Sequence, residues 1–140
     1  MNDLVVDASV AIKWLFREKG SEEAEQIIKR ISLFYVPLIF PVEMDSVITK
    51  KVRRKELQID ESCEKRKQVR KLPFKIEWDE NVSQLAFEVA ISLPVTYYDA
   101  TYLATAIEKY AMFVTADRKL VNGISKTSLE DYIIYFKDCV

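Results

Sequence analysis

The sequence predicts a single α/β domain over residues 1–140, with a mainly parallel central sheet of about five short strands and helices on both faces. Short apolar runs alternate along the chain with longer segments of helical periodicity, which is typical of a parallel sheet with helical crossovers. The expected connections are short, and a chain of 140 residues is long enough to bury one good core. Right-handed crossovers then distribute the helices over both faces of the sheet.

Strands are expected at residues 4–6, 33–36, 74–78, 112–115 and 133–136. Most are continuous apolar runs that are too short for a helix. The run at 74–78 instead alternates Phe, Ile and Trp with Lys and Glu, and this period of two indicates a strand with one buried face.

In the N-terminal half, helices are expected at residues 8–17, 21–30 and 41–55, with a fourth, strongly basic helix ending before Pro73. Ser21 and Asp60 are expected to cap the second and fourth helices, because short polar side chains accept hydrogen bonds from helix N-terminal N–H groups. Pro41 suits the first turn of the third helix. The expected core positions of that helix are Val42, Val47 and Ile48.

In the C-terminal half, Asp79 is expected to cap a helix with one continuous apolar stripe. The stripe consists of Val82, Leu85, Ala86, Val89, Ala90 and Leu93. The next helix, residues 99–110, is apolar on nearly all sides, which is typical of a buried helix. A short helix after Asp117 is expected to end at Asn122-Gly123.

Four carboxylates from distant parts of the sequence are expected at one edge of the sheet. Asp7 and Asp117 each follow an apolar strand, Asp99 opens the buried helix, and Glu43 lies in the first turn of the third helix. Open parallel sheets bind ligands at this carboxyl edge, so the four should lie within reach of one metal cluster. Hard oxygen ligands favour Mg²⁺ or Mn²⁺, which activate water and stabilise both oxygens of a phosphodiester displacement. The pattern predicts metal-assisted hydrolysis of a nucleic acid.

Each of these carboxylates also has a purely structural explanation. Aspartate is a favoured helix N-cap, and a glutamate near a helix start is stabilised by the helix dipole. Taken singly, each residue is more simply read as a cap, whereas the coincidence of all four at one edge favours a site. Asp45 lies two positions from Glu43, so it points elsewhere on the helix and is not included.

Composition restricts the chemistry further. The chain has no histidine and only two cysteines, which excludes the usual histidine-based general-base mechanisms and gives no zinc-ligand spacing. No apolar run has the length of a membrane span, and the N-terminus carries an acidic residue where a signal peptide is positive. A cytoplasmic protein without a membrane partner is therefore expected.

Positive charge is concentrated in residues 50–71, which hold ten Lys or Arg and four Asp or Glu, although the whole chain has a net charge of −1. A basic segment on an acidic body can contact phosphate backbones. The candidate RNA contacts are Arg53, Arg54, Arg66 and Lys67, together with Arg118 and Lys119 beside the carboxylates. A solvated helical hairpin, or a surface for a second copy of the chain or another protein partner, explains the same charges.

Aromatic residues near the expected site also have two explanations. Trp14, Tyr97 and Tyr98 lie close in sequence to the carboxylates and could stack on bases. Such residues belong more often to a core or an interface, and the sequence does not separate these roles.

Four segments resemble the PIN-domain family, and most closely its VapC-type ribonuclease toxins. They are VVDAS, the glutamate of PVEMDSVITKKVRRKEL, YYDATYLATA and VTADRKL, and the similarity runs from about residue 3 to 123. Each segment alone is a weak signal, but the ordered set is specific. One departure is Ser46, where the family often has Asn; it affects no expected catalytic residue.

The resemblance implies a ribonuclease that uses one or two Mg²⁺ or Mn²⁺ ions, forms a homodimer or higher oligomer and is inhibited by a cognate antitoxin. The family's acidic quartet corresponds to Asp7, Glu43, Asp99 and Asp117. The resemblance further implies that Ser9 and Thr115 help to hold the cluster. The three aspartates would bind metal directly or through water, and Glu43 would orient or deprotonate the attacking water or complete a second metal site.

Other functions are compatible with this fold. A receiver-like phospho-acceptor domain should have an acidic pair after the first strand and a lysine after a late one, and neither is evident. A catalytically silent PIN-like adaptor is disfavoured by the intact acidic set. An RNA-processing nuclease outside a toxin–antitoxin pair keeps the same chemistry, and a small antitoxin gene directly upstream would favour the toxin.

Overall fold

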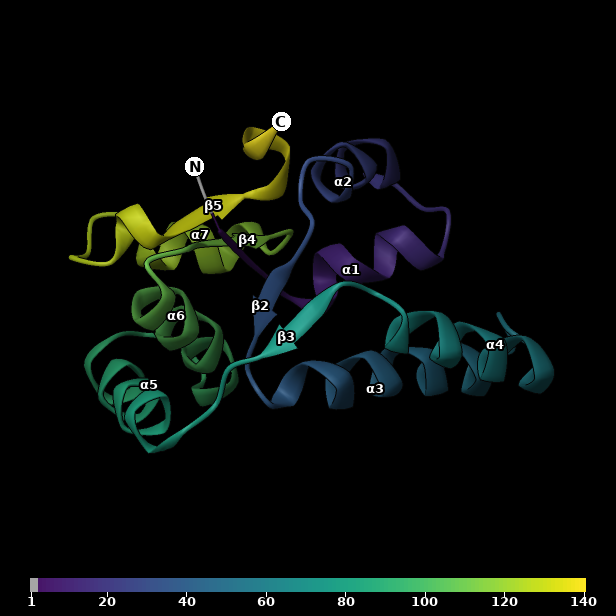
Figure 1. The fold of residues 1–140 in the computed structure, drawn as a ribbon, viewed down its shortest axis with the longest axis horizontal. Helices are drawn as coiled ribbons and strands as arrows, with labels where there is room; N and C mark the ends of the chain where they lie inside the picture. The colour runs from purple at the N-terminus through teal and green to yellow at the C-terminus, as the bar shows by residue number, and fades with distance from the viewer. Residues whose placement is uncertain (1–2) are drawn as a thin grey trace.

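Five parallel strands form the central sheet of the computed structural model, which describes residues 3–140 (Figure 1). The strands are β1 (Leu4–Val6), β2 (Phe34–Val36), β3 (Phe74–Ile76), β4 (Met112–Thr115) and β5 (Ile133–Tyr135). Their order across the sheet is β3-β2-β1-β4-β5. The predicted α/β fold is confirmed; residues 1 and 2 of the expected domain lie outside the described residues.

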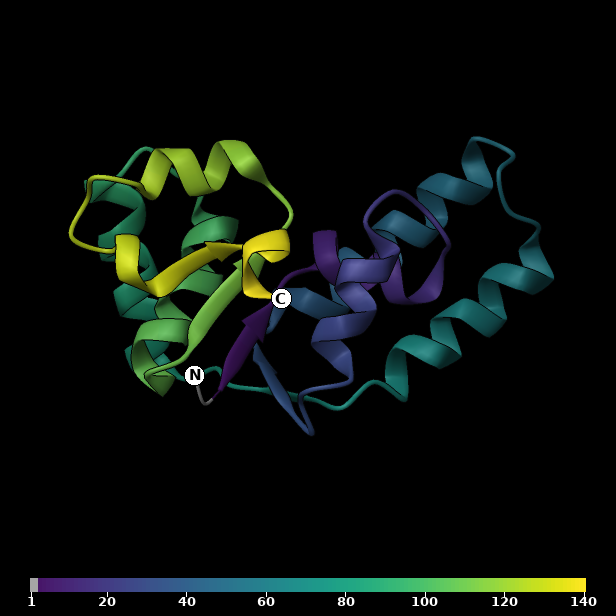
Figure 2. The same ribbon diagram turned by 90° about the horizontal axis from the view of Figure 1, so that it is seen from above.

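Helices fill the connections between consecutive strands. They are α1 (Ala8–Leu15), α2 (Ser21–Ile28), α3 (Ile39–Arg53), α4 (Ile59–Arg70), α5 (Glu80–Ser92), α6 (Tyr97–Lys109) and α7 (Arg118–Ile124), with short 3₁₀ turns at Glu130–Tyr132 and Phe136–Cys139. In Figure 2 the α1–α4 region lies to one side of the sheet and the α5–α6 region to the other, as right-handed crossovers require. Within the described residues, no helix combines the length and apolarity needed to cross a bilayer.

The direction of the chain across the sheet reverses between β1 and β4. From β1 the chain moves outward through β2 to β3, and then returns through α5 and α6 to β4 on the other side of β1. β1 and β4 pair in register, with Val6 opposite Val114. In doubly wound sheets a crevice opens at such a reversal, beyond the carboxyl ends of the two strands. Residues that directly follow β1 and β4 are therefore placed at a potential ligand site.

α6 is the buried helix that the sequence predicts. Seven consecutive residues, 100–106, are buried, and the helix packs against β1, β2 and β4. The ring of Tyr102 stacks on that of Phe113 in β4, with ring centroids 5.4 Å apart and planes 13° apart. This packing gives the N-terminal end of α6 a fixed position beside the carboxyl ends of the central strands.

α3 and α4 form a hairpin that projects beyond the sheet (Figures 1 and 2). Lys51 and Lys65 place their ammonium groups over the ring of Phe16, at 4.7 and 4.9 Å from its centroid. The two helices are also joined by Asp45 of α3, which accepts hydrogen bonds from Arg66 and Arg70 of α4 at 3.0–3.2 Å. The hairpin is thus held to the body near the end of α1 by contacts with Phe16.

Two expected caps of the N-terminal helices are wrong. The N-cap of α2 is Gly20, and the Ser21 hydroxyl instead donates to the backbone oxygen of Phe16. Gln58 caps α4 in a reciprocal arrangement with Glu61, which leaves Asp60 inside the helix. Gln58 lies before the expected start of the helix, so its capping box with Glu61 was not identified from the sequence.

α3 begins two residues before Pro41, and this shift changes which of its residues face the core. The buried residues are Phe40, Met44 and Ile48, whereas Val42 is 59% exposed, contrary to prediction. Glu43 is the fifth residue of the helix and so lies beyond its first turn. The dipole explanation for Glu43 is therefore weakened, because dipole effects fade within the first turn.

The C-terminal helices show one correct cap and one incorrect one. Asp79 caps α5 as predicted, accepting a hydrogen bond from Val82 N at 2.9 Å. α6 begins at Tyr97 rather than Asp99, and its N-cap is Thr96, whose Oγ1 accepts from Asp99 N at 3.1 Å. α7 continues through Gly123 to Ile124.

The cap of α6 is directly testable. Thr96→Ala should lower the free energy of unfolding by about 1 kcal/mol, because the Asp99 N–H loses its acceptor. Asp99→Asn should cost far less, since the Asp99 carboxylate does not cap the helix. Urea denaturation of both variants measures the difference. If Thr96→Ala left the free energy of unfolding unchanged and Asp99→Asn lowered it, Asp99 rather than Thr96 would be the cap.

Candidate functional site

Asp7 directly follows β1 and is 8% exposed. Both oxygens of its carboxylate accept hydroxyl hydrogen bonds: Ser9 Oγ donates to Oδ1 at 2.5 Å and Thr115 Oγ1 donates to Oδ2 at 2.7 Å. Although Asp7 precedes α1, its side chain makes no capping hydrogen bond. A buried carboxylate is costly unless it is hydrogen-bonded, and here the two hydroxyls offset part of that cost.

The same two hydroxyls join β1 and β4 beyond their carboxyl ends. Ser9 Oγ accepts from Ala116 N at 2.9 Å, and Thr115 Oγ1 accepts from Asp117 N at 3.1 Å. The two hydroxyl oxygens are 3.3 Å apart. This network sets the start of the loop after β4, and therefore the direction in which Asp117 leaves the strand.

Asp117 and Asp99 differ in their local roles. Asp117 is exposed and caps α7, accepting from Leu120 N at 3.1 Å. Asp99 is the third residue of α6 and is half-buried, and its carboxylate does not cap the helix. Of the three aspartates predicted as site residues, only Asp117 acts as a side-chain cap.

Glu43 projects from the second turn of α3 and meets α6 through Tyr102. The Tyr102 hydroxyl donates to Glu43 Oε1 at 2.5 Å. The tyrosine is 1% exposed, and sequence reasoning treated it only as an apolar core residue. The spacing could have identified Tyr102 as a neighbour of the site, because it lies three residues after Asp99 and therefore on the same face of the helix.

The negative charge of each carboxylate acts on the next one around the site, from Asp117 through Asp99 and Glu43 to Asp7. Burial raises the pKa of Asp7 from 3.8 to about 7, and the charge of Glu43 makes a smaller contribution in the same direction. The Ser9 and Thr115 hydroxyls and the Val10 N–H oppose this rise. Burial also raises the pKa of Glu43, and the charge of Asp99 raises it further. The pKa of Asp99 is raised by burial and, to a lesser extent, by the charge of Asp117. Repulsion between neighbours of like charge is one of the physical causes of such shifts.

The Tyr102 hydroxyl lies within the same field. Its pKa is raised well above the usual value by burial and by the charges of Glu43, Asp7 and Asp99. The hydroxyl therefore remains a proton donor across the physiological range. The acidic quartet and Tyr102 together form one electrostatically coupled group at the reversal between β1 and β4.

The donor chemistry of this group suits a hard divalent cation, because it consists of carboxylate and hydroxyl oxygens only. As the side chains stand, however, no set of three or more acidic or cysteine side chains among residues 3–140 is arranged closely enough to hold a metal ion. A neighbouring carboxylate helps to raise the pKa of Asp7, Glu43 and Asp99, but the quartet does not form a ready coordination shell. The expectation of a single metal cluster is therefore still a prediction.

The six basic candidates fall into two groups. Arg66 and Lys67 form ion pairs with Asp45 and Glu64, and Arg118 lies 3.7 Å from the centroid of the Tyr135 ring. Arg53, Arg54 and Lys119 are exposed and make no ion pair within residues 3–140. The second group has side chains free to contact phosphate.

The aromatic candidates also separate. Trp14 is half-buried, donates its indole N–H to Ala24 O at 2.7 Å and packs edge-on against Phe34, so it belongs to the core. Tyr97 and Tyr98, which flank Asp99, are 40% and 59% exposed. Of the three aromatic candidates, the two tyrosines are therefore the ones exposed to solvent beside Asp99.

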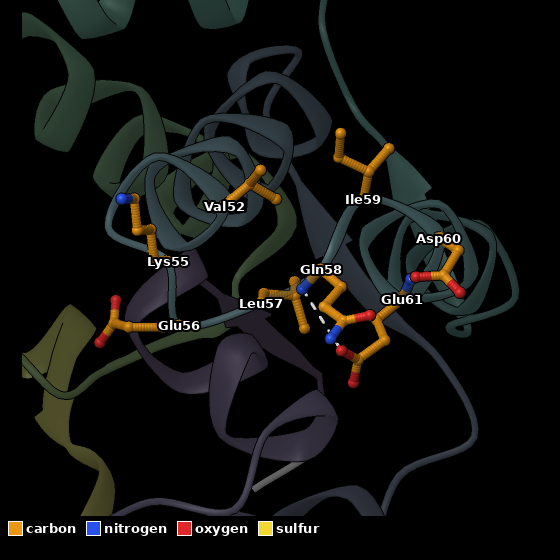
Figure 3. A pocket seen from close by; sticks show the side chains of 8 residues that line it. All are labelled: Val52, Lys55, Glu56, Leu57, Gln58, Ile59, Asp60 and Glu61. Atoms are coloured by element: carbon orange, nitrogen blue, oxygen red, sulfur yellow. Dashed lines mark hydrogen bonds between the residues drawn. The ribbon is translucent and has the colours of Figure 1, made fainter.

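A separate open pocket lies at the tip of the α3–α4 hairpin and is lined by residues 52 and 55–61 (Figure 3). Glu43 lies nine residues before Val52 on α3, which is roughly 14 Å along the helix at 1.5 Å per residue. The lining carries Lys55, Glu56 and Asp60 on an exposed turn, and Figure 3 shows their charged groups pointing in different directions. The hollow is distinct from the carboxylate site and gathers no matched set of polar groups.

The burial of Asp7 predicts a specific dependence of stability on pH. The folded protein holds the Asp7 proton more tightly than the unfolded chain does, so stability falls as the pH rises from about 4 to about 7. Asp7→Asn removes this penalty and should stabilise the metal-free protein by up to about 4 kcal/mol at pH 8, at about 1.4 kcal/mol per pKa unit. Denaturation in EDTA at pH 5 and pH 8 measures the gain, which should be clearly larger at pH 8.

The exposed Asp131 provides the matched control, since Asp131→Asn should change stability equally at both pH values. An Asp7→Asn gain that is the same at pH 5 and pH 8 would mean that the Asp7 carboxylate carries no burial penalty.

Comparison with known proteins places this geometry in a family. The PIN domain matches residues 4–123. The chain is similar to the ribonuclease VapC3 of Pyrobaculum aerophilum, with 29% identity over 119 residues that cover 84% of this chain and 91% of that protein.

Solved structures share the fold. The P. aerophilum protein PAE2754 superimposes with a TM-score of 0.73 at 20% identity, covering 99% of this chain and 93% of that one. A chain from a toxin–antitoxin complex of Klebsiella pneumoniae gives a TM-score of 0.65 at 18% identity, covering 95% of this chain and 96% of that one. The family match spans β1 through most of α7 and includes all four carboxylates, and the chain therefore belongs to the PIN-domain family.

Proposed function

We propose that this PIN-domain protein is a ribonuclease that depends on Mg²⁺ or Mn²⁺, and that it acts as the toxin of a toxin–antitoxin pair. The observation that carries the proposal is the coupled quartet at the reversal between β1 and β4. The similarity to the P. aerophilum ribonuclease VapC3 supports the activity. The similarity to a K. pneumoniae toxin–antitoxin complex supports the biological role.

Structural roles account for only one member of the quartet, Asp117, which caps α7. Asp7 and Asp99 make no capping bond, and Glu43 lies beyond the first turn of its helix. Carboxylates whose pKa is raised by burial and further by a neighbouring charge, as for Asp7, Glu43 and Asp99, are a pattern found at functional sites. A divalent cation would relieve this repulsion and draw the side chains together, which fits a group that is coupled but not yet arranged as a coordination shell.

Each residue has a proposed role. Asp7, Asp99 and Asp117 hold one or two ions, directly or through water, and Glu43 orients or deprotonates the attacking water or completes a second ion site. A bound ion supplies a more acidic water and stabilises the attacking and leaving oxygens of the phosphodiester. Ser9 and Thr115 orient the Asp7 carboxylate so that its remaining lone pairs point in a fixed direction.

The proposed partners are an RNA substrate, a cognate antitoxin and a second copy of the chain, in a homodimer or higher oligomer. Single-stranded RNA would reach the quartet past the exposed Tyr97 and Tyr98, whose rings can stack on bases. Arg53, Arg54 and Lys119 would contact phosphates, because their charges are not engaged by carboxylates within residues 3–140.

RNA cleavage tests the activity. With Mg²⁺ or Mn²⁺ the protein should cleave RNA, EDTA should abolish cleavage, and Asp7→Asn or Asp99→Asn should reduce the rate at least about 100-fold, a loss of about 2.7 kcal/mol of transition-state stabilisation. Cleavage of a labelled RNA, followed on denaturing gels, provides the measurement.

Asp45→Asn is the matched control, because Asp45 lies on the same helix as Glu43 but is bonded to Arg66 and Arg70. This variant should keep full activity. Cleavage that persists in EDTA, or that survives Asp7→Asn, would refute the proposed chemistry. Metal binding without any cleavage would instead indicate a silent adaptor.

The salt dependence of RNA binding tests the basic surface. Arg53→Gln with Arg54→Gln should reduce the slope of log K against log salt by about 1.4, because each phosphate contact to a single strand contributes about 0.7. Arg66→Gln with Lys67→Gln should change the slope less, since these residues are already paired with carboxylates. Equal effects of the two pairs would argue against this division of the hairpin.

A further inference from the structure

We propose that Tyr102 is a positioning residue: its buried hydroxyl fixes the orientation of the Glu43 carboxylate and so raises the affinity of the acidic quartet for a divalent cation. This inference rests on the proposed function, because it concerns the same site. It adds a residue that is neither acidic nor exposed, and that contacts the quartet from the interior of the protein.

The Tyr102 hydroxyl has a well-defined position. The side chain is 1% exposed on the buried helix α6, and its ring stacks on Phe113 of the central strand β4. A ring packed in this way has almost no rotational freedom, so its oxygen occupies one place relative to the sheet. Asp7 extends from the neighbouring strand β1, so the hydroxyl and Asp7 are fixed to the same rigid part of the fold.

Glu43 needs such a fixed partner. It projects from α3, the first helix of the hairpin that extends beyond the sheet, and it is half-buried. Within residues 3–140 the Tyr102 hydroxyl is the one side-chain donor bonded to its carboxylate, through Oε1. Fixing a glutamate side chain otherwise costs rotamer entropy at the moment a ligand binds. The hydrogen bond removes part of that cost in advance and leaves Oε2 available.

The chemical nature of the donor also matters. Lysine or arginine at this position would neutralise Glu43 and compete with a cation for it. A hydroxyl orients the carboxylate while leaving its negative charge in place, and it can do so next to Asp7 and Asp99 without altering the net charge of the quartet. A hydrogen-bonded group behind a metal ligand typically changes metal affinity by 10- to 100-fold when it is removed.

Mn²⁺ binding to the full-length protein, measured by isothermal titration calorimetry, tests the inference. Tyr102→Phe should weaken Mn²⁺ binding by about 10-fold, the lower end of the range for such groups. In a double-mutant cycle, Glu43→Gln combined with Tyr102→Phe should bind Mn²⁺ as Glu43→Gln alone does, because the hydroxyl acts only through Glu43. The exposed Tyr110, at the other end of α6, gives the matched control, and Tyr110→Phe should leave Mn²⁺ affinity unchanged.

Melting temperatures in EDTA separate positioning from folding. A purely structural role for the hydroxyl would lower the melting temperature of Tyr102→Phe without changing its Mn²⁺ affinity, and that result would overturn the inference. Additive losses in the double variant would overturn it as well. Absence of Mn²⁺ binding by the unmodified protein would refute the proposed metal site itself, and the inference with it.

Discussion

The hydrogen bonds that Ser9 and Thr115 donate to the Asp7 carboxylate are the interaction on which the rest of the site depends. They offset part of the cost of burying a carboxylate between the two central strands. They also define the point from which Asp117 leaves β4, since Thr115 Oγ1 accepts from Asp117 N. The chain reverses direction across the sheet at this place, and in doubly wound sheets such a reversal is where ligands bind. One small network thus connects the topology of the sheet to the chemistry at its edge.

Around this network the fold combines rigid and adaptable parts. Asp7 and Tyr102 belong to the packed interior, and their positions follow from the central strands and α6. Glu43 and Asp99 are half-buried on helices, and Asp117 is exposed at the start of α7. Two groups of the site are thus held in the packed interior, and the other three carboxylates lie nearer the surface, where a cation can reach them. The projecting α3–α4 hairpin supplies positive charge at a distance, where it does not neutralise the quartet.

Much of this could be predicted from the sequence, because the fold and the quartet follow from local signals. Short apolar strands ending in Asp7 and Asp117 define the sheet edge directly. The errors concern boundaries: α3 and α6 begin two residues earlier than expected, which moved Glu43 out of the first turn and transferred the cap of α6 from Asp99 to Thr96. The Tyr102–Glu43 bond spans 59 positions, so no local pattern contains it. The pairing of Arg66 with Asp45 also depends on how two helices pack.

The most direct measurement of the central claim is a crystal structure of the protein with bound Mn²⁺, using anomalous scattering to locate the ion. The account predicts a peak coordinated by oxygens of Asp7, Asp99 and Asp117, directly or through water, with Glu43 beside it and still bonded to Tyr102. Mn²⁺–oxygen distances should be close to those of Mg²⁺, about 2.1 Å. A peak bound elsewhere, or four carboxylates that stay apart in saturating Mn²⁺, would contradict it.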